Sequence, residues 1–175
     1  MQCLPYQRGV TLIEVLVAVL VFSVGLIGVA GLLVMSARSN HAAYLRTQVT
    51  FLAQSMADRM QANLIGVWNG GYDGTYPNGN VQDCGAGCTP DQLARHDQGV
   101  WSSQLLTFLP AGTRATVACR AAGLAYMPRR DQLALRPPYG GSCTMTVIWA
   151  ELGTGVANSS EDNHPLQTFA WEFQP

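Results

Sequence analysis

Charged residues are scarce in this chain of 175 residues, and lysine is absent altogether. Charged side chains make up 12% of the sequence, against about a quarter in typical soluble domains. All ten basic residues are arginines, which we attribute to genome composition, and the formal net charge is −1. Since nucleic-acid binding proteins usually carry a basic patch or stripe, this composition predicts no nucleic-acid partner.

Motifs of catalysis and metal binding are missing as well. The chain contains no GxSxG, no HExxH and no phosphate-binding loop. His41, His96 and His164 have no paired nucleophile motif, and we interpret them as surface or capping residues. Asp73 and Asp83 lack the regular ligand offsets of a calcium loop. The sequence therefore predicts no enzyme, no cofactor and no metal site.

Proline is absent between Pro5 and Pro77, which allows one long helix from Thr11 to about Leu64. Residues 15–35 form a run of 21 residues without a charge. About 20 apolar residues span a bilayer as a helix, and this run is longer than the core of a secretory signal peptide. The sequence therefore predicts a single span in contact with membrane lipid.

The orientation of this span is predicted from the basic residues around it. Arg8 is the only basic residue before the run, and it favours a cytoplasmic N-terminus. Arg38 and Arg46 follow the run on the other side and weaken the difference in positive charge between the two ends of the span. With the N-terminus in the cytoplasm, the rest of the chain lies outside the cytoplasmic membrane.

Glu14 is an acid at the start of the apolar stretch. An acid at the centre of a bilayer costs about 2.5–3.5 kcal/mol on insertion scales, and less near the interface. Two interpretations follow from this cost. Glu14 is either an acid at headgroup depth in an ordinary anchor, or a functional carboxylate that needs a partner.

The segment "RGVTLIEVLVAV" resembles the class III prepilin signature of type IV pilins and pseudopilins. That signature is a short polar leader ending in glycine, followed by an apolar stretch with glutamate at its fifth position. With Val10 as the first mature residue, where phenylalanine or methionine is usual, Glu14 is the fifth. The resemblance implies cleavage between Gly9 and Val10 by a prepilin peptidase and N-methylation of Val10. It also implies that Glu14 pairs with the terminal amine of a neighbouring subunit.

Residues 12–33, "LIEVLVAVLVFSVGLIGVAGLL", are similar to the N-termini of the PilV family of type IV pilus modification proteins. That resemblance implies a non-catalytic minor pilin that helps to prime pilus assembly. The implied partners are the prepilin peptidase, other minor pilins, the major pilin, the inner-membrane assembly platform and a tip adhesin. The I-type minor pseudopilins of type II secretion share much of this segment and are the alternative. A membrane-tethered periplasmic enzyme or binding module would need a convergent polar pocket, which the sequence does not indicate.

The same resemblance implies three parts of the chain and a location for each. Residues 1–9 are the prepilin leader, and residues 10–37 are the transmembrane or filament-core helix. Residues 38–175 are the periplasmic pilin domain, which includes the second half of the long helix. The chain is therefore expected in the inner membrane as a single-pass protein and afterwards in the pilus.

Periodicity beyond the membrane segment predicts an α+β fold, in which the long helix packs on a small antiparallel sheet. Apolar residues at steps of four and three trace one face of the helix: Leu45, Val49, Leu52, Met56 and Met60. Residues 66–89 are rich in Gly, Asn and Asp and are predicted to form a loop. Thr89, Pro90 and Gln92 then predict the start of a second helix. It runs towards Phe108, with Trp101, Leu105 and Phe108 on one face.

Three segments alternate apolar and polar residues and predict strands of an antiparallel sheet with one face on a helix, namely residues 114–120, 143–151 and 167–173. Residues 128–141, "PRRDQLALRPPYGG", are predicted to be a solvated loop. A contact patch for another subunit, centred on Arg129 and Arg130, is the alternative for this loop.

The five cysteines are Cys3, Cys84, Cys88, Cys119 and Cys143. Cys3 lies upstream of the apolar run, and the remaining even set fits an oxidising compartment. Cys119 and Cys143 fall on the inner faces of neighbouring predicted strands, and Cys84 and Cys88 flank a flexible Gly-Ala-Gly. We therefore favour bridges 84–88 and 119–143 over the two other pairings and over a four-cysteine zinc site.

Overall fold

The computed structural model describes residues 9–79, 81–121, 128–151 and 166–175. The predicted leader before Gly9, with Cys3, and the third histidine, His164, lie outside these ranges. The described elements are, in order, α1 (Leu12–Ala62), α2 (Leu64–Trp68), β1 (Gly74–Tyr76), α3 (Pro90–Phe108), β2 (Arg114–Ala121), α4 (Arg130–Leu133), β3 (Gly141–Ala150) and β4 (Leu166–Phe173). The chain divides into two compact units, Met1–His41 and Ala42–Pro175.

The first unit holds the N-terminal part of α1 and is exposed along its whole described length. Its large apolar side chains between Val10 and Met35 are all at least half exposed. The helix contains an 18-residue window of mean hydropathy 2.7 with none of its residues buried, so it is long and apolar enough to cross a membrane. None of the described residues buries this segment, which is what a helix placed in lipid or among other helices shows.

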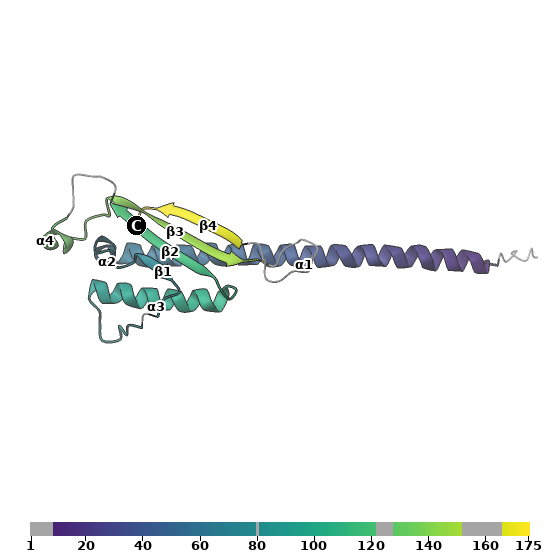
Figure 1. Ribbon diagram of the computed structural model, residues 1–175, viewed down its shortest axis with the longest axis horizontal. Helices are drawn as coiled ribbons and strands as arrows, with labels where there is room; N and C mark the ends of the chain where they lie inside the picture. Colours follow the sequence, from purple (N-terminus) through teal and green to yellow (C-terminus); the bar gives the residue numbers. More distant parts are fainter. Residues whose placement is uncertain (1–8, 80, 122–127, 152–165) are drawn as a thin grey trace, which may run out of the picture. The chain divides into compact units, whose positions relative to one another are not determined.

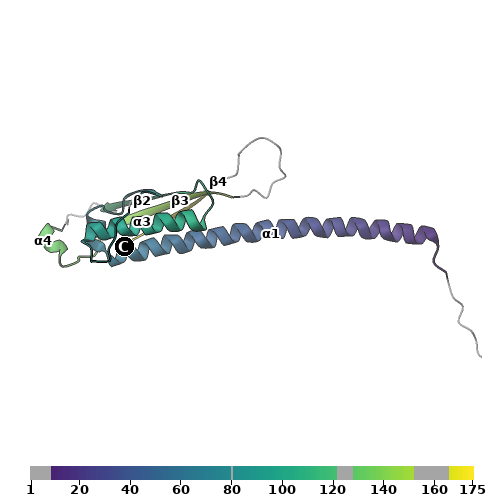
Figure 2. The ribbon, with the colours of Figure 1, turned by 90° about the horizontal axis from the view of Figure 1, so that it is seen from below.

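The second unit is built on a four-stranded antiparallel sheet in the order β1-β2-β3-β4 (Figure 1). The part of α1 in this unit and α3 lie on the same face of the sheet (Figure 2). The Trp101 indole N–H of α3 donates to the Leu52 carbonyl of α1 at 2.9 Å. The arrangement confirms the predicted α+β fold, a long helix packed on a small antiparallel sheet.

The core lies between these helices and the inner face of the sheet. All five residues of the predicted α1 stripe are buried, from Leu45 at 3% exposed to Met60 at 0%. Helix α3 begins as predicted with a capping box, in which the Thr89 hydroxyl and the Gln92 side chain each accept from the other residue's backbone N–H. The predicted apolar face of α3 is wrong at one position, because Phe108 in the last turn is 45% exposed.

Two predicted loops contain regular structure. The segment 66–89 includes the end of α2 and the strand β1, so the sheet in the described part of the chain has four strands and not the three predicted. The segment 128–141 includes the short helix α4. The long helix ends at Ala62, just before the predicted limit, because Asn63 caps α2 by accepting from the Gly66 N–H. The elements α2, β1 and α4 have three to five residues each, too few for a periodic pattern to reveal them.

Candidate functional site

The predicted processing site lies just before α1 and is open to solvent. Gly9 and Val10 precede the helix, and the Val10 side chain is 70% exposed. The Thr11 carbonyl accepts from the N–H groups of Glu14, at 3.1 Å, and Val15, at 3.3 Å, which starts the helix. The bond between Gly9 and Val10 is therefore outside the helix, where the backbone is accessible to another protein.

Glu14 lies in the first turn of α1 and is exposed. Within the described ranges its carboxylate forms no hydrogen bond or ion pair. A negative charge in the first turn interacts favourably with the partial positive charge of the helix N-terminus, which supplies about 0.3–1 kcal/mol. That interaction is smaller than the cost of burying the charge in lipid, so it does not offset that cost. Both carboxylate oxygens remain able to form an ion pair with a cation from another chain.

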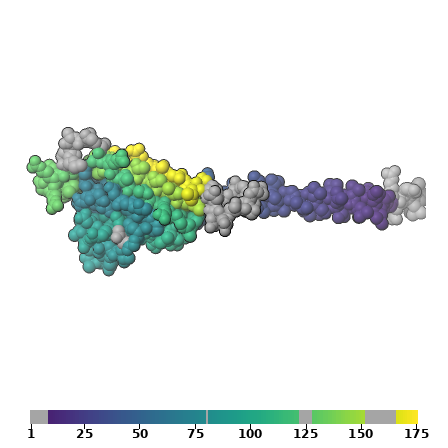
Figure 3. Space-filling model, viewed as in Figure 1, coloured from purple at the N-terminus to yellow at the C-terminus, as the bar shows by residue number. Residues whose placement is uncertain are grey.

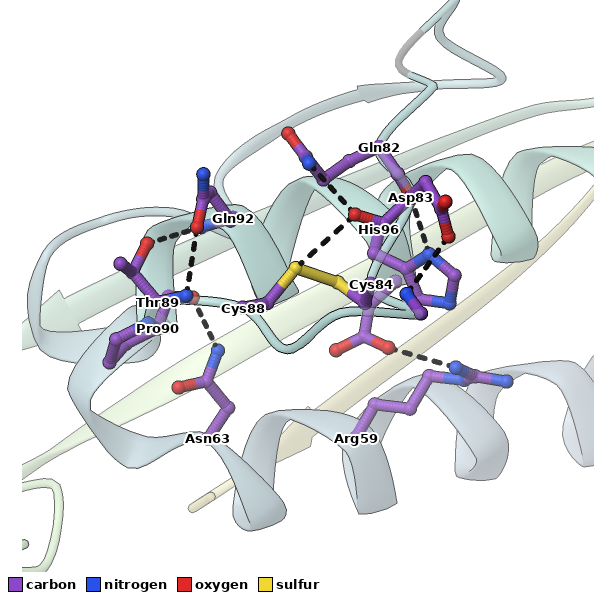
Figure 4. The surroundings of a disulfide bond; sticks show 12 residues. Arg59, Asn63, Gln82, Asp83, Cys84, Cys88, Thr89, Pro90, Gln92 and His96 are labelled. Atoms are coloured by element: carbon purple, nitrogen blue, oxygen red, sulfur yellow. Dashed lines mark hydrogen bonds and ion pairs between the residues drawn. A yellow bond between two sulfur atoms is a disulfide. The ribbon is translucent and has the colours of Figure 1, made fainter.

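Two disulfides join the four downstream cysteines, Cys84 to Cys88 and Cys119 to Cys143. The first closes a five-residue ring directly before α3, and the three residues between the cysteines are exposed (Figure 4). The Asp83 carboxylate accepts from the Gly85 N–H at 2.9 Å and shapes this ring. The ring therefore restrains the backbone that leads into the capping box of α3.

The second disulfide crosses the sheet between directly opposed residues of β2 and β3. The Cys119 N–H donates at 2.9 Å to the Asp73 carboxylate, next to β1, so it points away from β3. Cys119 and Cys143 therefore form a non-hydrogen-bonded pair, the kind in which opposed side chains come closest in an antiparallel ladder. Their Cα atoms lie 3.9 Å apart.

A buried polar cluster connects α1, α3 and the segment before β1. Arg59 donates to Asp97 at 2.8 Å, and the Tyr72 hydroxyl donates to the other Asp97 oxygen at 2.8 Å. Asn63 donates to the Tyr72 hydroxyl at 3.1 Å and to the Pro90 carbonyl at 2.8 Å. Burial and the hydrogen bond to Asp97 raise the pKa of Tyr72 well above its usual value. These contacts join α1, α3 and the segment before β1 through the buried side chain of Asp97.

Sequence reasoning missed this cluster because its members are far apart in the chain. Arg59 and Asp97 are separated by 38 positions, and neither belongs to a local motif. Of the histidines in the described ranges, His41 is exposed, and His96 Nδ1 lies 2.6 Å from the Gln82 carbonyl. His96 therefore makes a local contact with the segment beside the disulfide ring (Figure 4).

Comparison with protein families gives one match. Residues 4–30 match the family model described as the prokaryotic N-terminal methylation motif. No curated protein matches the chain, and no solved structure matches it. The motif is that of the type IV pilin and pseudopilin superfamily, whose members are structural and non-catalytic subunits.

Proposed function

We propose that this pilin-type chain is a minor pilin, a structural subunit that enters a type IV pilus and helps to prime its assembly with other minor pilins. The methylation motif at residues 4–30, which ends inside an exposed apolar helix, carries the proposal. The similarity of residues 12–33 to the PilV family supports the assignment within the superfamily.

The proposed role assigns a task to each part of the chain. Residues 1–9 are a leader that the prepilin peptidase removes, and Val10 becomes the methylated N-terminus. Residues 10–37 hold the subunit in the inner membrane and later in the filament core. Residues 38–175 lie in the periplasm, an oxidising compartment that suits two disulfides. The assembly platform, the major pilin and a tip adhesin are the further partners.

Glu14 is proposed to pair with the amine of Val10 in a neighbouring subunit. Inside a bundle of apolar helices the local dielectric is low, so an unpaired carboxylate is costly and an opposite charge is strongly attracted. The pair would favour the subunit's transfer from lipid into the filament. The unpartnered, exposed carboxylate of Glu14 is the observation that supports this role.

Replacement of Glu14 tests the role directly. Glu14→Leu should leave membrane insertion unchanged and reduce the amount of subunit in sheared pili at least tenfold. Glu14→Asp, which keeps the charge, is the matched control and should retain more subunit in pili than Glu14→Leu. Immunoblots of the pilus and membrane fractions measure both quantities. Unaltered incorporation of Glu14→Leu would mean that Glu14 is only an interfacial acid.

Deletion of the whole chain separates the pilus from the secretion filament. Loss of surface pili with normal protein export supports the minor pilin. Blocked export with normal pili would assign the chain to the I-type minor pseudopilins of type II secretion, which share the anchor.

A further inference from the structure

A cavity of about 330 Å³ lies between α1 and the sheet, at the start of β4. Arg46 and Thr50 of α1 form one wall, and Trp149 of β3 with residues 167–169 of β4 forms the other. Figure 3 shows β4 in yellow along one margin of the second unit. The volume is at the lower end of the range for small-molecule pockets, so the cavity suits a ligand with a single ring.

Two buried polar side chains at this cavity lack hydrogen-bond partners among the described residues. Trp149 is 3% exposed, and its indole N–H has no acceptor. Glu151 is 7% exposed, and its Oε1 atom has no donor. The two residues alternate with the less buried Ala150, which places both side chains on the inner face with Cα atoms roughly 7 Å apart. Buried polar groups are nearly always paired, so this donor and this acceptor indicate a bound molecule.

Arg46 contacts both the cavity and Glu151. It lines the cavity, and its Nη2 atom lies 3.6 Å from Glu151 Oε2. That distance is longer than a hydrogen bond, and the Arg46 side chain is 63% exposed, so the ion pair is weak. The guanidinium group can therefore turn towards solvent and open the Glu151 carboxylate to the cavity.

The side chains around the cavity define the chemistry of its ligand. Arg46 and Glu151 carry opposite charges, so the site favours a neutral molecule over an anion or a cation. The ligand must donate to Glu151 and accept from Trp149, and hydroxyl groups do both. Trp149 and Phe169 supply aromatic surface, and Gln167 supplies an amide. A ligand that combines several hydroxyl groups with an apolar C–H face matches this lining.

We propose that the cavity binds a neutral saccharide ring. One hydroxyl group would donate to the Glu151 carboxylate, and a neighbouring hydroxyl group would accept from the Trp149 indole N–H. The C–H face of the ring would pack on the aromatic wall, and the Gln167 amide would pair with a further hydroxyl group. The ligand thus satisfies the two buried groups that the described part of the chain leaves unpaired.

The proposal goes beyond the minor pilin assignment and does not depend on it. It requires only residues of the second unit, whose cavity is the same in a pilus or in a secretion filament. Failure of the saccharide test leaves the Glu14 and deletion tests unaffected.

The test uses the isotope-labelled full chain in detergent and follows the Trp149 indole N–H signal by NMR. The probes are the methyl pyranosides of glucose, galactose and mannose. At least one should shift this signal saturably, with a dissociation constant of about 1 mM, as expected for a ligand with few heavy atoms. Tetrahydropyran-2-methanol keeps the ring and the hydroxymethyl group but lacks the ring hydroxyls, and it should give no shift.

A matched pair of variants changes the protein at and beside the cavity. Trp149→Phe removes the indole N–H but keeps an aromatic ring, and it should weaken sugar binding at least tenfold. Trp171→Phe makes the same change further along the inner face, outside the cavity lining, and should bind within twofold of the unaltered chain. The backbone N–H signal of Phe169 reports binding in both variants. The probe without ring hydroxyls decides the question even where Trp149→Phe disturbs folding, since it leaves the protein unchanged.

Three outcomes would overturn the proposal. One is the absence of a saturable shift with all three sugars. Another is an equal shift by tetrahydropyran-2-methanol, which would mean that the hydroxyl groups are not recognised. The last is a long-lived water at the Trp149 N–H that no sugar displaces, which would assign the cavity to water alone.

Discussion

The two units keep their apolar residues in opposite places. In the first unit the large apolar side chains from Val10 to Met35 face outwards. In the second unit Leu52, Met56 and Met60 of the same helix are fully enclosed. The described residues leave the first unit uncovered, which suits a helix placed in lipid or among other chains. The second unit is held by its own core, its disulfides and the ion pair of Arg59 and Asp97. We expect changes in one unit to leave the properties of the other intact, and four predictions test this separation.

The largest expected effect is on processing in the first unit. Gly9→Leu should leave all of the chain as uncleaved precursor, because a bulky side chain at the cut site blocks the peptidase. Gly9→Ala is the small-residue control, and N-terminal sequencing distinguishes the two products. The thermal unfolding of the second unit should be unchanged in both. A normal start at Val10 in Gly9→Leu would contradict the peptidase assignment.

The largest expected loss of stability comes from the buried cluster of the second unit. Asp97→Ala leaves Arg59 without its counter-charge and Tyr72 without its acceptor. The Arg59 side chain is 29% exposed, but the buried Tyr72 hydroxyl also loses its acceptor, so we expect the two losses together to cost about 3–5 kcal/mol of unfolding free energy. Asp58→Ala, on the exposed side of α1, should change it by less than about 0.5 kcal/mol. Chemical denaturation followed by tryptophan fluorescence measures both, and equal stabilities would refute the role of the cluster.

The two disulfides should contribute unequally to the stability of the second unit. They span sequence separations of 24 and 4. From loop entropy alone, Cys119→Ser with Cys143→Ser should cost about 3.5 kcal/mol, and Cys84→Ser with Cys88→Ser about 2 kcal/mol. Denaturation of both double variants under one set of conditions gives the comparison. A reversed order would show that the exposed ring does more than close a short loop.

The smallest expected effect, counted per tyrosine and per pH unit, is a loss of stability at alkaline pH, again confined to the second unit. Burial raises the pKa of Tyr72 and of Tyr76 above the ordinary value near 10. Above pH 10 the unfolded chain releases these protons while the folded chain keeps them, so the unfolding free energy falls as the pH rises. The slope should be about 1.4 kcal/mol per pH unit for each tyrosine. Tyr76→Phe removes one titrating group, so the slope should fall by about 1.4 kcal/mol per pH unit. Denaturation between pH 9 and 12 measures the slope. An unchanged slope would mean that Tyr76 titrates alike in both states.

Much of the fold could be predicted because its patterns are local. The α1 stripe repeats every three or four residues. The three longer strands carry an apolar residue at every second position over 115–119, 143–149 and 169–173, so each element indicates its own buried face. The capping box of α3 lies within four consecutive residues, Thr89 to Gln92. Strand β1 escaped prediction because three residues in a glycine-rich stretch carry no readable alternation.

Three features depend only on residues close together in the sequence, so the sequence alone determined them. They are the spacing of Gly9 and Glu14, the length of the apolar run and the faces of the long strands. Contacts between distant segments were decided by register and packing. The pairing of Arg59 with Asp97 is one such contact. Another is the need for glycine at 141, where a side chain would collide with the Arg120 carbonyl of β2. The position of β4 at the edge of the sheet is a third, because which strand lies last in a sheet depends on the order in which all of them pair.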